Sequence, residues 1–251
     1  MTRVVADAFT IFRREALRYR RDRAYWVGQT VFPLALVAFL GLGLNDVVRL
    51  PSGADYLGHL ASGVLVLVVG SGAVGGGFSL IEDRESGFLR ALLVAPVSRS
   101  SIVLGKLVAR LLASLLLVAL LVGVLALFTS LRVVHPAAAL LAVVGVTAVC
   151  VALGIALGSR LRRLESFRLI AALVTVPLYL FSGMFYPLET LPAVLRIPAY
   201  ANPLTYGVDL FRFGVLGVSE LPVAFSVVML TLLTVVALLA SVAIFDRAAH
   251  R

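Results

Sequence analysis

The charged residues between positions 82 and 110 have types and an order that suit an ion-pairing contact with another protein surface. Three acids, Glu82, Asp83 and Glu85, come first in this stretch. The basic residues are Arg84, Arg90, Arg99, Lys106 and Arg110. Long apolar runs lie on both sides, so the charged insert has to sit at a water interface. We interpret it as an elbow that docks a partner on the cytoplasmic side, with a solvated surface helix as the alternative.

A glycine pattern further upstream resembles a nucleotide-binding motif but has the wrong surroundings for one. The pattern GxGxxG starts at Gly70, yet a dinucleotide site needs a strand before it and a helix after it in a βαβ unit. Here the pattern lies within an apolar run, which favours close packing of helices. The pairs Gly72/Gly76 and Gly154/Gly158 have the small-xxx-small spacing that lets helix backbones approach.

Other chemistry is poorly supported by the residue types. The one lysine, Lys106, is followed by leucine rather than by the Ser or Thr of a P-loop. His59 and Ser62 are one turn apart on one segment, so they cannot converge from separate helices as a catalytic pair. Cys150 is the single cysteine, and no zinc spacing is present. We therefore expect a chain that is not an enzyme and binds no metal or cofactor itself.

The composition is that of an all-α integral membrane protein. Of 251 residues, 61% are hydrophobic and 14% are charged, whereas a soluble domain carries about 25% charged residues. The mean hydropathy is +1.06, and several apolar runs reach the roughly 20 residues that cross a bilayer as a helix. Six spans are predicted, at 25–44, 57–81, 102–128, 136–158, 169–186 and 223–245, with the elbow at 82–101 and a proline-rich, re-entrant segment of short external helices at 187–222.

Residues 1–24 are predicted to form an amphipathic helix in the membrane interface. Apolar residues recur there at helical spacing, among them Phe9 and Phe12, and Arg14 and Arg18 fall on the opposite side. Such a helix anchors the chain to membrane lipid and leaves a basic face available to a partner.

The distribution of basic residues predicts the orientation of the spans. With the N-terminus inside, 18 of the 22 Lys and Arg residues fall in inside segments, and cytoplasmic loops carry this excess. Both termini are thus expected in the cytoplasm. The net charge of +9 is explained by this bias, so we expect no nucleic-acid partner. Acids lie at span ends or in loops, which disfavours a stand-alone ion-coupled transporter.

The elbow resembles the signature region of type-2 ABC exporter permeases, with an acidic cluster, Gly-Phe-Leu, a turn ending in Pro-Val-Ser-Arg, and a helix opening with Gly-Lys. In this sequence these residues are Glu82, Asp83, Glu85, Gly87, Phe88, Leu89, Pro96, Val97, Ser98, Arg99, Gly105 and Lys106. RRE at 13–15, FSGMFYPLETLP at 181–192 and ANPLTYGVDLFR at 201–212 extend the resemblance over nearly the whole chain. It is closest to the membrane subunits of daunorubicin and nodulation-factor exporters, although LASG at 60–63 lacks the proline common there.

The resemblance implies a multi-pass permease of the cytoplasmic (inner) membrane of a prokaryote, paired with a second copy of itself and with two ABC ATPase subunits. ATP and Mg are then bound by the ATPase, and the elbow is a coupling helix. The coupling residues implied are Glu82, Asp83, Glu85, Gly87, Phe88, Leu89 and Arg90. A second ATPase contact is implied on the interface helix, at Arg13, Arg14, Glu15 and Arg18.

The resemblance also implies export of a hydrophobic or amphipathic substrate (drug, lipid or glycan-type) by alternating access, along a path between the two halves of the dimer. Candidate path residues in the fifth span are Tyr179, Phe181, Ser182 and Phe185. An aromatic belt at the membrane interface explains the same residues. The alternatives to an exporter are a stand-alone secondary transporter or channel, and a structural subunit of a membrane complex.

Overall fold

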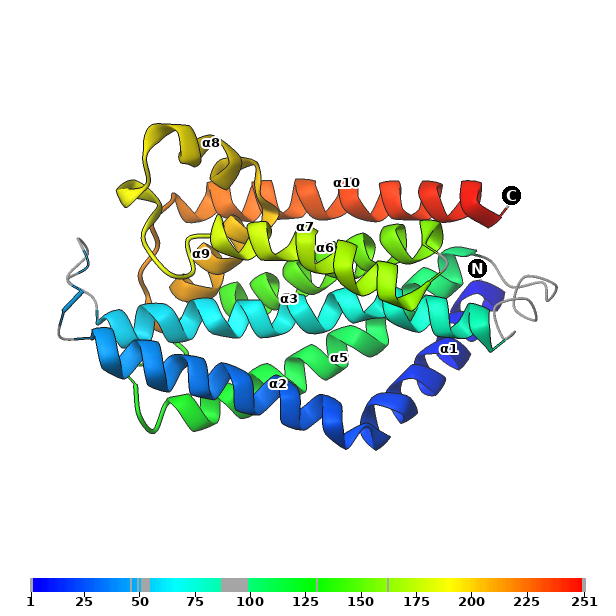
Figure 1. The fold of residues 1–251 in the computed structure, drawn as a ribbon, viewed down its shortest axis with the longest axis horizontal. Helices are drawn as coiled ribbons and strands as arrows, with labels where there is room; N and C mark the ends of the chain where they lie inside the picture. Colours follow the sequence, from blue (N-terminus) through cyan, green and yellow to red (C-terminus); the bar gives the residue numbers. More distant parts are fainter. Residues whose placement is uncertain are drawn as a thin grey trace.

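The computed structural model describes residues 2–45, 47–48, 50, 55–86, 99–129, 131–161 and 163–249. All regular structure within these residues is helical (Figure 1). The elbow is described only in part, because the coupling residues Gly87, Phe88, Leu89 and Arg90 lie outside the described residues.

The helices follow one another with short connections. They are α1 (Thr2–Arg21), α2 (Arg23–Leu36), the π-helix η1 (Val37–Leu42), α3 (Tyr56–Glu85), α5 (Arg99–Leu125), α6 (Pro136–Arg160), α7 (Leu164–Leu180), the 3-10 helix η2 (Leu188–Thr190), α8 (Ala193–Ala201), α9 (Pro203–Leu216) and α10 (Val223–Ala249). The first element after α1 starts at a capped break, where the Asp22 carboxylate accepts a hydrogen bond of 2.9 Å from the Tyr25 backbone N–H.

Five helical stretches in the described part of the chain are long and apolar enough to cross a membrane. They are Arg23–Leu42, Tyr56–Glu85, Ser101–Leu125, Pro136–Arg160 and Val223–Phe245. The prediction of an all-α membrane protein is confirmed. The sixth expected span corresponds to α7, which has 17 residues and so reaches about 25 Å, slightly less than a hydrocarbon core of about 30 Å. The count of six spans stays a prediction.

The helices α3 and α6 form the centre of the bundle. In their most apolar stretches α3 buries 78% and α6 67% of the residues, against 17% for α2 with η1 and 11% for α10. Large apolar side chains such as Phe32 and Phe39 on α2–η1 and Leu239 on α10 are exposed. Such outer faces suit contact with lipid or with another apolar helix.

Glycine lets α3 and α6 cross in direct backbone contact. A Cβ added at Gly77 would lie 1.9 Å from the carbonyl oxygen of Gly154, and one at Gly158 would lie 2.5 Å from that of Gly77. The prediction that Gly154 and Gly158 serve close packing is confirmed. The prediction for Gly72 and Gly76 is wrong in part, because Gly76 would meet only a side chain at 3.9 Å and Gly72 faces the Arg110 guanidinium.

The segment between α7 and α10 folds back onto the bundle. Asp209 on α9 accepts hydrogen bonds from the Ser226 hydroxyl and from the Glu220 backbone N–H, both at 2.7 Å. Arg212 donates to Glu220 at 2.5 Å and to the Gly183 carbonyl at 3.0 Å. The helix α9 also packs against α3, α6 and α10, so it lies within the protein.

Figure 1 places the two chain ends at one end of the bundle and α8 at the other. The helix α1 runs obliquely beside α5, and Gly105 lets it approach closely, since a Cβ there would lie 2.8 Å from the Ala8 carbonyl oxygen. The end of α3, the start of α5 and α1 therefore come together at the end where the elbow belongs.

Candidate functional site at the elbow end of the bundle

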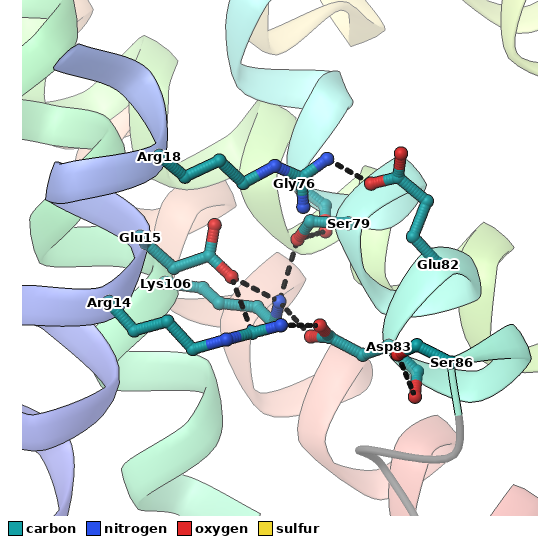
Figure 2. Close-up of polar contacts among 9 residues, drawn as sticks. All are labelled: Arg14, Glu15, Arg18, Gly76, Ser79, Glu82, Asp83, Ser86 and Lys106. Carbon is teal, nitrogen blue, oxygen red and sulfur yellow. Dashed lines mark hydrogen bonds and ion pairs between the residues drawn. The ribbon is translucent and has the colours of Figure 1, made fainter. Parts of the chain in front are cut away.

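The ammonium group of Lys106 lies at the centre of a buried polar network between α1, α3 and α5 (Figure 2). It is 2.8 Å from a carboxylate oxygen of Glu15 on α1 and 2.8 Å from one of Asp83 on α3. It also donates to the Ser79 hydroxyl at 2.6 Å, and that hydroxyl donates to the Gly76 carbonyl at 2.9 Å. Its three donors thus have three partners on two other helices.

Two partly exposed arginines of α1 complete the network. Arg14 is 2.6 Å from the second carboxylate oxygen of Asp83 and 3.5 Å from Glu15. One turn further along α1, Arg18 forms an ion pair with Glu82. The charges of Glu15 and Asp83 are thus balanced by those of Lys106 and Arg14, and the Arg18–Glu82 pair lies beside them.

The burial of this network determines how it affects the stability of the protein. The side chains of Lys106, Glu15 and Asp83 are 2%, 1% and 2% exposed. A pair with so little water contact gains little over an apolar replacement, but removing one member leaves a buried charge at a cost of about 3–5 kcal/mol. The network therefore specifies how α1, α3 and α5 meet, because separating them would expose or orphan charges.

Helical spacing explains how these residues converge. Arg14 and Arg18 are four residues apart on α1, and Ser79 and Asp83 are four apart on α3, so each pair shares one face. For Arg18, burial alone would lower the pKa, but the hydrogen bond and the charge of Glu82 outweigh burial and raise the pKa above its ordinary value. The guanidinium stays charged beside Glu82.

The structure brings together residues that the sequence assigned to two separate contacts with an ATPase. Glu82 and Asp83 of the elbow pair with Arg18 and Arg14 of the interface helix, and Glu15 lies between them. The remaining described members, Glu85 on α3 and Arg13 on α1, are exposed. The side chain of Lys106 is enclosed between these helices.

The last turn of α3 is also tied to α6. Arg84 donates to the carbonyl oxygens of Leu161 at 3.1 Å and Ser159 at 3.2 Å, at the end of that helix. These carbonyls lack partners within their own helix, as all C-terminal carbonyls do. The base of the elbow is thus held by contacts to α1, α5 and α6.

A cavity of about 460 Å³ adjoins the network, between α1, α2, α3, α5 and α7. Its lining includes Arg110, which is 2% exposed. The guanidinium carbon of Arg110 lies 5.1 Å from the ring centre of Tyr19 and 4.8 Å from that of Tyr25. A desolvated cation–π contact contributes about 2 kcal/mol, while taking a guanidinium out of water costs several kcal/mol, so the rings offset only part of that cost.

The candidate path residues lie at the far end of α7 from this cavity. Tyr179 is buried against Gly70 and Cys150, with its hydroxyl oxygen 3.0 Å from the Cβ position of Gly70. Ser182 donates to the Tyr179 carbonyl at 2.7 Å. Phe181 and Phe185 are partly buried and pack on apolar clusters of the protein. Their role in a path stays a prediction.

The importance of Lys106 and Arg110 was missed by reasoning from the sequence, although one signal was present. A lysine within an apolar span, with no acid four residues away, needs a counter-charge from another helix. Glu15, an acid within a strongly basic helix, and Asp83 were the candidates. Nothing in the sequence could say which acid would face Lys106.

A bundle of membrane-length helices defines a polytopic membrane protein, and in this one a charged network ties α1, α3 and α5 together. The comparison with known proteins makes this specific. Residues 7–216 match the family model described as ABC-2 type transporter, and the chain belongs to that family.

Relatives with assigned names agree with the family. The transport permease ycf38 of Porphyra purpurea is 30% identical over 219 residues, covering 84% of this chain and 74% of the relative, and that of Pyropia yezoensis is 31% identical over the same shares. The inner membrane transport permease YadH of Escherichia coli K12 is 26% identical, covering 85% of this chain and 84% of YadH. The protein is thus a transport permease, the membrane subunit of an ABC transporter.

Proposed function

We propose that this permease is the membrane half of an ATP-driven exporter in the cytoplasmic membrane of a prokaryote. Two copies pair with two ABC ATPase subunits, both termini lie in the cytoplasm, and a hydrophobic or amphipathic substrate crosses by alternating access. ATP and Mg bind to the ATPase. Permeases of this family typically pair with such a subunit, and YadH carries the name of an inner membrane permease.

The observation that carries the proposal is the charged network around Lys106. It joins the end of α3 and the start of α5, which flank the elbow, and fastens α1 to both. A force on the elbow then moves three helices together, because sliding any one of them would separate buried charges. A transport subunit driven by another chain needs this kind of connection between docking surface and spans.

The burial of these residues supports a division between those that brace the elbow and those that dock the ATPase. In this proposal the inward-facing members Asp83, Glu15 and Arg14 brace the elbow, whereas the exposed Glu85 and Arg13 are free to contact the partner. The apolar anchor of the contact is Phe88, which lies outside the described residues. Mixed charged and apolar contacts are typical of docking surfaces.

The test changes the charge and the apolar side chain proposed to contact the ATPase and leaves the residues of the network unchanged. The double variant Glu85→Arg, Phe88→Asp is expected to abolish transport and to reduce co-purification of the ATPase that accompanies the wild-type permease. The reason is that a repelling charge replaces an attractive one and a carboxylate replaces the apolar anchor. Pull-down of the ATPase and ATP-dependent transport in vesicles are the two measurements.

The matched control is Glu189→Arg, which reverses an exposed acid in η2, between α7 and α8 and outside the network. This variant should keep the ATPase bound and should keep transport. Unchanged transport by the double variant would contradict the coupling assignment. Transport by the permease without any ATPase would favour the stand-alone transporter or channel instead.

A further inference from the structure

We infer that the cavity around Arg110 binds the anionic head group of an amphiphilic substrate. The cavity has a volume of about 460 Å³ and is walled by α1, α2, α3, α5 and α7. This assignment rests on the proposed transport function, since it names the class of substrate that the permease carries. The shared chemistry is a phosphate-type anion joined to an apolar body.

Arg110 supplies a buried positive charge without an internal counter-charge. Among the described residues no carboxylate lies within ion-pair distance of its guanidinium, and the buried Nε atom has no hydrogen-bond partner. The hydroxyl of Tyr25 in the same lining is also buried and lies close to the side chains of Gln29 and Arg110. A buried guanidinium nitrogen without a partner beside a cavity points to a ligand that accepts hydrogen bonds and carries negative charge.

The surrounding groups reinforce the preference for an anion. In the described lining, Arg18, Arg110 and Arg168 outnumber the one acid, Asp22. Arg18 is neutralised by Glu82, and the Asp22 carboxylate caps α2. Arg168 lies over the ring of Phe78, with its guanidinium carbon 5.3 Å from the ring centre. The cavity keeps an excess of positive charge for an incoming head group.

The rest of the lining favours an amphiphile over a free anion. Phe78, Val74 and Phe167 give the wall apolar surface, and Ala171 and Ala172 leave room beside them. The wall α7 also carries exposed apolar side chains, Leu169, Leu173 and Val176, so an apolar tail can follow the head group without entering water. A small glycine contributes too, because a Cβ at Gly72 would lie 1.6 Å from an Nη atom of Arg110.

Binding is tested on the full-length permease in phosphatidylcholine nanodiscs, titrated with phosphatidylglycerol and followed by native mass spectrometry. We expect Arg110→Gln to weaken phosphatidylglycerol binding by about 10-fold or more, because a charge-assisted contact is lost. Ala172→Phe keeps the charge and fills the cavity from an exposed position, and it should weaken binding as well. Arg160→Gln, an exposed arginine outside the lining, is the matched control and should bind like the wild type.

Several outcomes would overturn the assignment. Equal retention of added phosphatidylcholine and phosphatidylglycerol, or wild-type binding by both Arg110→Gln and Ala172→Phe, would remove the site. Displacement of the lipid by an equal concentration of inorganic phosphate would replace the amphiphile by a free anion. If Arg110→Gln fails to fold, phosphatidylglycerol binding by Ala172→Phe alone decides: wild-type binding by that variant would remove the site.

A second arm asks whether the bound amphiphile is cargo. Phosphatidylglycerol should stimulate ATP hydrolysis by the assembled wild-type complex but not by the Arg110→Gln complex. Binding without stimulation would show a structural lipid and overturn the cargo assignment. Failure of any ATPase to associate with the permease would instead contradict the proposed function, and the binding arm on the permease alone would still decide the cavity.

Discussion

Lys106 and Arg110 lie one turn apart on α5 and are both buried, yet their charges are balanced in different ways. Lys106 has two carboxylates within 2.8 Å, whereas Arg110 lies between two tyrosine rings beside a cavity. A compact ammonium gains most from close acids, and a planar guanidinium can stack on aromatic faces. The first side chain thus joins helices, and the second has capacity left for a ligand.

At the residue scale, the network predicts a loss of stability that a second change can relieve. Lys106→Met leaves Glu15 and Asp83 with only Arg14 between them, so we expect the free energy of unfolding to fall by about 3–5 kcal/mol. Adding Glu15→Gln restores neutrality, because Arg14 and Asp83 remain as one pair, and should recover part of the loss. Thermal unfolding of the purified permease in detergent measures both.

Exposed arginine provides the comparison for this experiment. Arg160→Gln removes one positive charge outside the network and should leave the melting temperature nearly unchanged. The explanation fails if the double variant loses as much stability as the sum of its two single variants, since independent sites behave in that way.

At the element scale, two close helix contacts position the site. The crossing of α3 and α6 passes through Gly77, and α1 approaches α5 at Gly105. In both contacts a larger residue would collide with a backbone carbonyl oxygen of the facing helix. A rotamer change of a side chain could not relieve that collision. Because α3 carries Ser79 and Asp83 just beyond its crossing point, the packing at Gly77 determines where the acid meets Lys106.

The crossing predicts a difference between neighbouring glycines. Gly77→Ala would place a methyl group 1.9 Å from the Gly154 carbonyl oxygen, so the helices must separate, at a cost of about 1–3 kcal/mol or more. Gly75→Ala, two residues earlier on α3, would place its methyl group in open space and should be neutral or slightly stabilising, since alanine favours a helix. Thermal unfolding of the two variants side by side tests this, and equal melting temperatures would refute the packing argument.

At the scale of the whole molecule, the end of α3, the start of α5 and both chain ends lie at one end of the bundle and α8 at the other. By sequence, 18 of the 22 basic residues fall in the segments predicted to lie inside. The positive-inside bias predicts that this end faces the cytoplasm, as in the proposed function. The ATPase and the external segment would then be on opposite sides of the membrane.

This orientation predicts labelling from opposite sides. Arg196→Cys on α8 should react with a membrane-impermeant maleimide added to intact cells, whereas Arg163→Cys, before α7, should react only after permeabilisation. Both positions are exposed. The native Cys150 is 1% exposed, so the wild-type protein should not be labelled and serves as the control. Reaction of both variants in intact cells would overturn the topology.

Much of the fold could be predicted from local patterns. Apolar runs of bilayer length identified the helices of α2, α3, α5, α6 and α10, because a span must satisfy its backbone within itself. Boundaries were less certain. The helix α3 runs on to Glu85 instead of ending at 81, and α7 ends at Leu180 instead of 186. The charged residues 82–85 continue α3 although they are polar, and the apolar residues after Leu180 do not continue α7. Hydropathy therefore did not mark either helix end.

The candidate site was predicted only in outline. Glu82, Asp83, Arg14, Glu15 and Arg18 were all singled out, but as outward-facing contacts to a partner. Their actual partners are one another and Lys106, and such pairs depend on which helix faces which. No spacing within a single helix contains that information.

The sequence by itself determined the class of protein, the placement of most spans and the charge bias between the two ends, because hydropathy and local spacing act along the chain. Only the tertiary structure decided that Lys106 joins α1, α3 and α5, that Gly77 makes the central crossing, and that Arg110 faces a cavity. These features arise where side chains from distant segments meet. Burial there makes an unpaired charge costly, so the pairing of helices and the pairing of charges are settled together.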